Sequence, residues 1–322
     1  YFGFSYLGEL NFGSYGLGVT LFSGFLVLIL APEFFQPLRD LGTFYHAKAQ
    51  AVGAAEALET FLSAEGEQMG NGTRQLAADQ PLTLQANALE ILSPNGVLLA
   101  GPLSFTLQPQ QRVALVGLSG AGKSSLLNLL LGFLPYRGSL TVNGVELRDL
   151  SAENWRQQLS WVGQNPHLPA QTLRANILLG CPQADEAQLQ QAVEHAYVSE
   201  LLPYLPQGLD TEVGDNAARL SVGQAQRVAV ARALIGPRRL LLLDEPAASL
   251  DAHSEQRVMQ ALNAASHQQT TLLVTHQLED TEDYDQIWVM DNGRIVQQGD
   301  YATLSAQPGL FATLIAHRRG EL

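Results

Sequence analysis

The stretch GLSGAGKS, residues 117–124, carries glycines, a lysine and a serine at the spacing of a phosphate-binding loop. It lies between a short apolar run (112–117) that favours a strand and a leucine-rich run (123–133) that favours a helix. Glycines let the backbone curl so that several N–H groups point at one anion, and the following helix adds the positive end of its dipole. We therefore expect phosphate contacts from the whole loop, namely Gly117, Leu118, Ser119, Gly120, Ala121, Gly122, Lys123, Ser124 and Ser125.

Two polar side chains of this loop have separate tasks. The Lys123 ammonium is expected to reach the β- and γ-phosphates of ATP, and the Ser124 hydroxyl is expected to bind Mg²⁺. The alternative is a chance glycine-rich turn with no ligand. The strand pattern before the loop and the helix pattern after it argue against that alternative.

An acidic pair follows four leucines in LLLLDEP, residues 240–246. The apolar strand would deliver Asp244 to the phosphate side of a sheet, where it can hold Mg²⁺ through water. Glu245 follows directly and is placed to polarise an attacking water. Phosphoryl transfer needs charge compensation and an aligned nucleophile rather than covalent help, so this pair suits ATP hydrolysis. Without the loop upstream, the pair would be read as surface charge.

Two further polar residues come after apolar strands. Gln164 follows one strand in WVGQNP, and His276 follows another in VTHQ. Each alone is more often structural. Together, in a domain with a phosphate loop, they are expected to act in catalysis by sensing the γ-phosphate and the attacking water. Gln164 is also a candidate Mg²⁺ ligand beside Ser124 and Asp244.

The segment LSVGQAQRVAVARAL, residues 220–234, predicts a helix that Ser221 caps. The first-turn N–H groups of such a helix are free to bind an anion. As an isolated string it is a capped helix and nothing more. Its place about 100 residues after the phosphate loop and just before the Asp-Glu strand gives it further meaning.

These motifs together resemble the ATPase of ABC transporters. The phosphate loop, Gln164, LSVGQ, LLLLDEP, AASLD (247–251) and His276 occur in that family's order and spacing, over residues ~83–318. The segment 211–224 resembles exporters in which ATPase and membrane helices share one chain. More narrowly, residues 31–56, the LSVGQ helix and DEPAASLDAHSEQRVM (244–259) resemble the CydD-type subunits of the bacterial CydDC exporters.

The resemblance implies a partner. ATP would bind between two ATPase domains arranged head to tail, one from this chain and one from a homologous CydC-type half-transporter, in a heterodimer. The signature would then cap the partner's ATP through Ser221, Gly223 and Gln224. Position 222 departs from the family pattern, with Val in place of Gly. Because a β-branched residue disfavours φ > 0, we expect a cost of order 1 kcal/mol if the closed dimer needs that backbone region, and we expect two unequal ATP sites.

A second departure concerns the base. The family usually stacks an aromatic side chain on adenine about 25 residues before the phosphate loop. Here Ser93 stands near the expected place, and no Tyr, Phe or Trp lies between Phe61 and Phe105. The residue that contacts adenine is therefore left open.

The elements that must position these motifs predict an α/β fold. Apolar strands at 112–117, 159–164, 240–246 and 270–277 alternate with helices, one of them at 185–205, which predicts a mostly parallel sheet. Asn-Gly pairs predict antiparallel hairpins over 139–147 and 286–299. The fold class expected is a P-loop NTPase of the ABC type, with an antiparallel β subdomain and a helical subdomain, preceded by a transmembrane α-helix.

The N-terminal region contains a long uncharged stretch that is suited to a membrane, unlike the rest of the chain. Leu10–Pro32 carries no charge, and as a helix its 23 residues would span about 34 Å, enough for a hydrocarbon layer of ~30 Å. A buried core helix is the alternative. We expect residues 1–66 to end a transmembrane domain, 67–82 to be a linker and 83–322 to be the ATP-binding domain. Because the chain begins with Tyr1, we expect it to be a piece of a longer protein.

The net charge of −13 argues against nucleic acid as a partner, since phosphate backbones need clustered Lys and Arg. Cys181 is the single cysteine, which excludes an internal disulfide and predicts an ordinary reduced thiol. We expect an ATPase subunit of an exporter in the bacterial inner membrane, contacting lipid and a small-molecule cargo. From the resemblance alone, that cargo is cysteine, glutathione or haem. Two alternatives stay open: a soluble ABC ATPase acting on nucleic acid or ribosomes, and a regulatory half that does not hydrolyse ATP.

Overall fold

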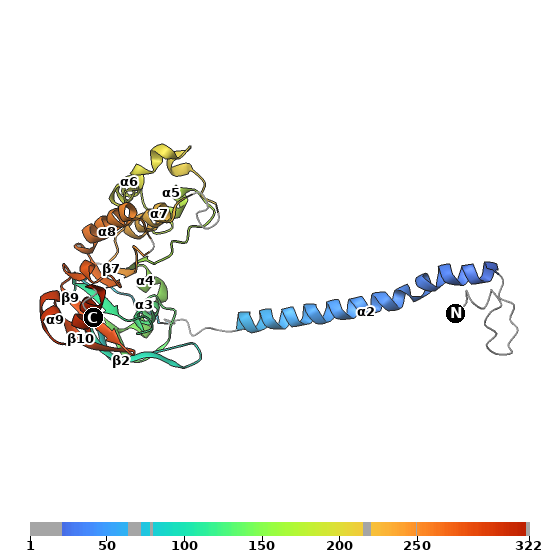
Figure 1. Ribbon diagram of the computed structural model, residues 1–322, viewed down its shortest axis with the longest axis horizontal. Coiled ribbons are helices and arrows are strands. Elements are labelled where there is room, and N and C mark those ends of the chain that lie inside the picture. The colour runs from blue at the N-terminus through green and yellow to red at the C-terminus, as the bar shows by residue number, and fades with distance from the viewer. Residues whose placement is uncertain (1–20, 64–71, 78–79, 215–219, 249, 320–322) are drawn as a thin grey trace. The chain divides into compact units, whose positions relative to one another are not determined.

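The computed structural model describes residues 21–63, 72–77, 80–214, 220–248 and 250–319. Contacts divide the chain into two units, residues 1–66 and 67–322, and each is described by itself. The first unit contributes one long helix, α2 (Leu21–Ser63), and the second contributes both β-sheets and the remaining helices (Figure 1).

Helix α2 continues through Pro32 and Pro37 and exposes many large apolar side chains, among them Phe25, Leu28 and Ile29. Of the predicted membrane segment Leu10–Pro32, residues 10–20 lie outside the described residues. Within the part of the chain that is described, no helix combines the length and the apolarity that crossing a membrane requires.

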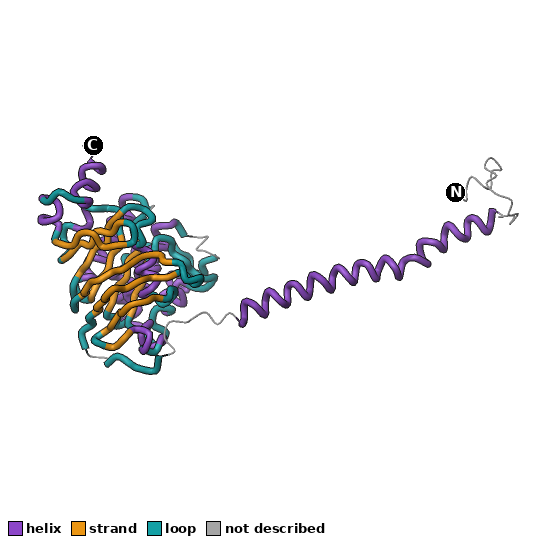
Figure 2. The backbone as a smooth tube through the Cα atoms, turned by 90° about the horizontal axis from the view of Figure 1, so that it is seen from below, coloured by secondary structure: helices purple, strands orange, loops and turns teal. Residues whose placement is uncertain are grey.

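A six-stranded sheet forms the centre of the second unit, in the order β10-β9-β3-β8-β7-β6. The strands of this unit are the orange segments of Figure 2. The strands of the six-stranded sheet pair in parallel except for β10, which is antiparallel to β9. The leucines of β7 and the apolar run of β3 are buried, as expected for strands covered on both faces. The prediction of a mostly parallel sheet is confirmed. The strands are β3 (Arg112–Gly117), β6 (Leu159–Val162), β7 (Leu240–Asp244), β8 (Thr270–Val274), β9 (Gln286–Asp291) and β10 (Arg294–Gly299).

A second sheet is antiparallel, in the order β2-β1-β4-β5. It consists of β1 (Leu84–Leu92), β2 (Leu98–Leu107), β4 (Tyr136–Val142) and β5 (Val145–Glu146). The β4–β5 hairpin turns at Asn143-Gly144 and the β9–β10 hairpin at Asn292-Gly293, with positive φ at all four residues. Both hairpin predictions are confirmed. One apolar core joins this sheet to one face of the six-stranded sheet.

The helices of the second unit are mostly short. They are α3 (Lys123–Leu130), α4 (Ala152–Arg156), α5 (Leu173–Leu178), α6 (Glu186–His195), α7 (Val222–Leu234), α8 (Ala252–Ser266), α9 (Tyr301–Ala306) and α10 (Leu310–Arg319). Helices α5, α6 and α7 gather at one end of the unit, with β2, β9 and β10 at the other (Figure 1). This arrangement matches the expected helical and β subdomains.

Two helices end earlier than the sequence predicts. Helix α3 ends at Leu130 instead of continuing to residue 133, and Gly132 with φ 87° follows. Helix α6 ends at His195, and short 3₁₀ turns replace the predicted helix up to residue 205. The backbone of Tyr197 is left-handed, with φ 56°, which a continuous right-handed helix cannot contain.

The described part of the predicted 67–82 linker packs on the second unit. Arg74 N–H donates to the Asp149 carbonyl at 3.1 Å, and Leu76 N–H donates to Asn154 Oδ1 at 2.8 Å. The side chains of Leu76 and Leu82 are buried in the core. The described residues before β1 are therefore held to the rest of the second unit by hydrogen bonds and by apolar contact.

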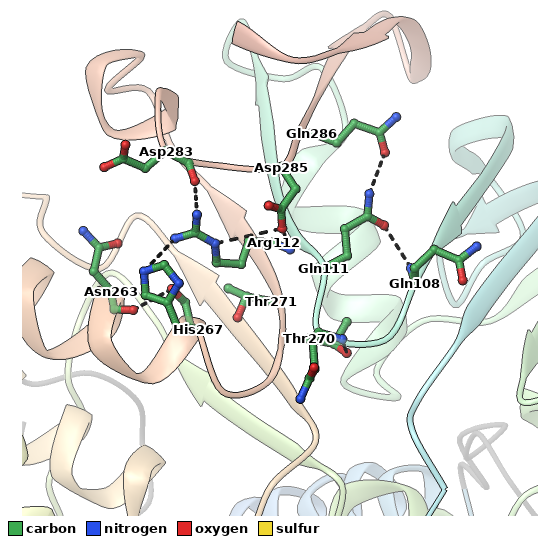
Figure 3. A network of polar contacts seen from close by, with 12 residues as sticks. Gln108, Gln111, Arg112, Asn263, His267, Thr270, Thr271, Asp283, Asp285 and Gln286 are labelled. Atoms are coloured by element: carbon green, nitrogen blue, oxygen red, sulfur yellow. Dashed lines mark hydrogen bonds and ion pairs between the residues drawn. The ribbon is translucent and has the colours of Figure 1, made fainter.

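Arg112 ties together three segments at the amino end of β3 (Figure 3). Its guanidinium, on a residue only 8% exposed, contacts His267 Nε2 at 3.3 Å and donates to the Asp283 carbonyl. The Arg112 backbone N–H donates to Asp285 Oδ2 at 2.7 Å. One side chain thus joins the start of β3, the end of α8 and the turn before β9.

We predict that Arg112→Met lowers the free energy of unfolding by about 1–3 kcal/mol, because it removes the contacts of the charged guanidinium with His267, the Asp283 carbonyl and Asp285. Chemical denaturation measures this change. Arg294→Met, the same substitution at an exposed residue of β10, is the control and should be near neutral. Equal stability of the two variants would show that the Arg112 network contributes nothing.

Candidate functional site

The parallel register brings four strand ends to one edge of the sheet. Val162 of β6 pairs with Leu243 of β7, and Asp244 of β7 pairs with Val274 of β8. Val274 in turn pairs with Leu115 of β3. The residues that follow these positions therefore emerge side by side, at the carboxyl ends of the strands where open α/β sheets bind ligands.

The phosphate loop leaves β3 at this edge. Gly117 has φ 154°, and a Cβ there would lie 2.1 Å from the Met290 carbonyl oxygen, so any side chain would push β3 away from β9. Gly122 precedes α3 with a left-handed φ of 98°, and a Cβ there would lie 3.0 Å from the Ala100 Cβ. The loop therefore needs glycine at both ends for steric reasons that the motif alone does not reveal.

Lys123 lies inside the loop. It is 6% exposed, and its Nζ donates to the Gly117 carbonyl at 2.8 Å and to the Leu118 carbonyl at 3.0 Å. Burial lowers the pKa of Lys123, against the opposing attraction of Glu245 and Asp244. The ammonium is thus enclosed by carbonyl oxygens, with two carboxylates nearby to balance its charge.

The two carboxylates after β7 have different environments. Burial raises the pKa of Asp244, and the charge of Glu245 raises it further, while Lys123 and His276 act in the opposite direction. Glu245 Oε1 lies 2.6 Å from His276 Nε2, which brings together the predicted catalytic acid and histidine. The raised pKa means that the negative charge of Asp244 is unfavourable in this environment. A bound cation would stabilise that charge.

Glu245 adopts a strained backbone. Its φ is 47°, in the left-handed region that side chains other than glycine rarely occupy. The Glu245 N–H donates to the Val274 carbonyl at 2.9 Å, and the Glu245 carbonyl accepts from Ala248 N–H at 3.0 Å. Strain that neighbouring hydrogen bonds maintain is common at functional sites. Here it turns the chain just after the strand, where the carboxylate meets His276.

The predicted Mg²⁺ ligands share the same edge of the sheet. Ser124 is exposed in the first turn of α3, Gln164 is exposed two residues beyond β6, and Asp244 ends β7. Their hydroxyl, amide and carboxylate oxygens are the donors that Mg²⁺ takes in phosphate sites, with the phosphates as further ligands. The donor set therefore fits the metal. Ser125 follows Ser124 and is half-buried.

The predicted signature begins α7. Ser221 caps this helix: its Oγ accepts from Gln224 N–H at 3.2 Å, and its N–H donates to Gln224 Oε1 at 2.9 Å. Gln224, predicted to contact ATP, thus has its side-chain oxygen in a capping box. The signature is a helix N-terminus, as the sequence predicts.

Val222 begins the helix without backbone strain in this chain on its own. It is the first residue of α7, so its backbone is helical, and its side chain is 54% exposed. The expected cost of order 1 kcal/mol concerns a closed dimer that needs a positive φ at this residue, and φ is not positive in this chain on its own. The residue that must be glycine for steric reasons is the next one, Gly223, because a Cβ on Gly223 would lie 2.3 Å from Ser254 Oγ of α8.

Sequence reasoning assigned no role to Gln226, which the structure places against the segments that carry Gln164 and Glu245. The residue is fully buried and bridges the segments that follow β6 and β7. The available signal was a polar residue three positions after Gly223, on the same inward face of α7.

Ser93, near the expected adenine contact, accepts from Val97 N–H at 3.0 Å within the β1–β2 turn. Val97 itself is exposed.

Comparison with known proteins gives one family match and several long alignments. The family model described as "ABC transporter" matches residues 100–248. The transport ATP-binding protein AarD of Providencia stuartii is 67% identical over the whole chain. The glutathione/L-cysteine transport system ATP-binding/permease protein CydD of Escherichia coli is 69% identical over the whole chain. The chain spans about half the length of these relatives, covering 55% of each.

A solved structure shares the fold. A bacterial Atm1-family ABC exporter with ATP bound superposes with a TM-score of 0.75 at 30% identity. The match covers 92% of this chain and 52% of that one. Sequence and fold comparisons thus agree on the same kind of molecule.

We predict that Gly223→Ala lowers the free energy of unfolding by about 1–3 kcal/mol, because the added Cβ must push α7 away from α8. Val222→Ala, one residue earlier and exposed, is the matched control and should be near neutral. Adding Ser254→Gly to Gly223→Ala removes the clashing atoms and should restore part of the loss. Equal melting temperatures for the two single variants would contradict the packing argument.

We predict that Asp244→Asn stabilises the nucleotide-free and Mg²⁺-free protein at neutral pH, raising Tm by roughly 2–4 °C. A carboxyl whose pKa is raised in the folded state loses stability as pH rises through that pKa. The asparagine variant should therefore gain most above the raised pKa and converge with wild type as pH falls toward the ordinary value of 3.8. Glu282→Gln, at an exposed residue, is the control. A gain that persists unchanged at low pH would rule out this cause.

Proposed function

This chain belongs to the ABC transporter family, and from that premise we propose that it is the ATP-hydrolysing half of an exporter in the bacterial inner membrane. The observation that carries the proposal is the 2.6 Å contact of Glu245 with His276, at the sheet edge where the phosphate loop begins. This contact supports the proposal, because it pairs a candidate base with a polar partner on the side of the sheet where the γ-phosphate is expected. A merely nucleotide-binding domain would not need this pair.

The residues of the chain divide the work of hydrolysis. Backbone N–H groups of residues 117–125 and the Lys123 ammonium hold the phosphates of ATP and balance their charge. Ser124, Gln164 and Asp244 would hold Mg²⁺, which would supply further charge compensation to the phosphates. Glu245 accepts a hydrogen bond from the attacking water and aligns it. His276 and Gln164 fix the position of that carboxylate and of the γ-phosphate.

We propose that the signature serves a second ATP, held by a homologous CydC-type half-transporter. The start of α7 supports this, because Val222 is exposed there and Ser221 leaves first-turn N–H groups free for an anion. Any inequality of the two ATP sites would come from the backbone that Val222 adopts in the closed dimer or from what its side chain meets on the partner. Ser221, Gly223 and Gln224 would line that second site.

The membrane part of the proposal concerns the first unit. Residues 1–66 would end the transmembrane domain, with Leu10–Pro32 as its last span, residues 67–82 as the linker and residues 83–322 as the cytoplasmic ATPase domain. The cargo we propose is glutathione or L-cysteine, which the name of the Escherichia coli relative gives for that protein. ATP binding and hydrolysis would close and reopen the paired ATPase domains and so move the membrane helices.

We predict that Lys123→Ala weakens ATP binding, because it removes the cation that faces the phosphates. Glu245→Gln should keep ATP binding and lower the rate of hydrolysis about 100-fold or more, as expected when a general base is lost. Nucleotide binding and phosphate release are measured separately on the complex with the partner half. Glu282→Gln, an exposed acid replaced in the same way, is the control. Equal loss of binding and hydrolysis in Glu245→Gln would argue against a catalytic base.

The transport proposal has its own test. The full-length complex is reconstituted in vesicles, and movement of labelled glutathione and L-cysteine is followed with ATP. We expect ATP-dependent movement that stops in Glu245→Gln and continues in Glu282→Gln. ATP hydrolysis that no thiol stimulates, together with no thiol movement, would leave the ATPase assignment intact and overturn the cargo.

A further inference from the structure

Gln226 makes contacts that reach three parts of the site. It lies in α7, one turn after Val222, and its side chain is fully buried. Its Nε2 donates to the Gly163 carbonyl at 2.9 Å and to the Pro246 carbonyl at 2.7 Å. One amide group therefore connects α7 to the segment after β6 and to the segment after β7.

The two carbonyls fix the orientation of this amide. Turning it over would place Oε1 against two carbonyl oxygens, so the nitrogen must face them. Gln226 Oε1 is buried and accepts no hydrogen bond from the described residues. A buried acceptor without a donor costs free energy. Packing alone would be served better by an apolar side chain of the same size, so the two Nε2 bonds call for a different explanation.

Both acceptors sit next to residues of the catalytic site. The Gly163 carbonyl and the Gln164 N–H belong to the same peptide group. Because a peptide group is planar, a hydrogen bond that orients the carbonyl also orients the N–H of Gln164. Pro246 directly follows Glu245, whose backbone is strained at φ 47°. The hydrogen bonds of Gln226 thus hold the backbone on one side of Gln164 and of Glu245.

The same helix carries the signature. Ser221 and Val222 lie at its start, one turn from Gln226, and the capping box makes that turn rigid. On the arrangement of the proposed function, this turn contacts the ATP of the partner half. A displacement of the α7 start would therefore be transmitted through the Gln226 amide to the segments that carry Gln164 and Glu245.

We propose that Gln226 is a positioning residue that couples the two ATP sites of the dimer. It rests on the proposed function, because it needs a partner whose ATP meets the start of α7. Engagement of the partner's ATP by the α7 start sets the backbone of Gln164 and Glu245 for hydrolysis at this chain's own phosphate loop. Gln226 itself touches neither nucleotide.

The first test separates positioning from binding. Gln226→Met keeps the length of the side chain and removes the donor, and Gln260→Met makes the same change at an exposed residue of α8 as a control. Both are prepared as the full-length chain in complex with its partner. The partner's catalytic glutamate is replaced by glutamine, so that hydrolysis reports on this chain's site. We expect Gln226→Met to lower kcat by about 10- to 100-fold, as misplacement of catalytic groups does. ATP binding should stay close to that of the control, and the variant should stay folded, with a Tm lowered by the loss of its two hydrogen bonds.

The second test measures coupling. Ser221→Asp keeps the helix cap but places a negative charge where the partner's γ-phosphate would bind. It should slow hydrolysis at this chain's site when Gln226 is present, and should slow it little further in the Gln226→Met background. Such a double-mutant cycle isolates the interaction between the two positions. Fully additive effects would overturn the proposal.

Other outcomes are equally decisive. If Gln226→Met fails to fold, Gln226→Glu, of the same shape and without the amide donor, takes its place, and unfolding of both variants would make the residue structural and overturn the proposal. Unchanged kcat in a folded Gln226→Met would overturn it too. A wild-type complex that hydrolyses no ATP would instead refute the proposed function, which keeps the two failures distinguishable.

Discussion

The parallel register of β6, β7, β8 and β3 is the constraint on which the site depends. Strands paired in this register end at a common edge, so residues far apart in sequence emerge together. Asp244 is opposite Val274, and Val274 is opposite Leu115 of the strand that leads into the phosphate loop. A shift of one strand by one residue would exchange the side chains that face the two apolar cores and would move its polar end away from the others. The apolar runs in the strands therefore determine the position of the catalytic groups.

The site is built from groups that are individually unfavourable. Lys123 is buried with a lowered pKa, Asp244 has a raised pKa, and Glu245 occupies a strained backbone. Gln226 adds a buried acceptor without a donor among the described residues. Each feature lowers the stability of the domain, and each positions a charge or a hydrogen bond at the site on the carboxyl ends of the strands. The apolar cores on the two faces of the six-stranded sheet stabilise the fold that holds them.

Local chemistry made much of the fold predictable, and tertiary packing limited the rest. Asn-Gly pairs specify hairpins through their own backbone preferences, and the phosphate loop is specified by its glycines and lysine. The early end of α6 and the packing of residues 72–77 and 80–82 depend on contacts with distant segments. The steric need for glycine at 223 depends on Ser254, and the role of Gln226 depends on two carbonyls, of Gly163 and Pro246. Pairs of this kind cannot be read from one local stretch.

The central claim is that the phosphate loop of this chain and its signature serve two different ATP molecules. Vanadate trapped with ADP cleaves nearby backbone under ultraviolet light, so it maps which segments surround each γ-phosphate position. In the complex, we expect cleavage of this chain both at 117–124 and at 220–224. Replacing the phosphate-loop lysine of the partner should remove cleavage at 220–224 and leave cleavage at 117–124. Loss of cleavage at 220–224 on Lys123→Ala, with none on the partner's replacement, would contradict the account.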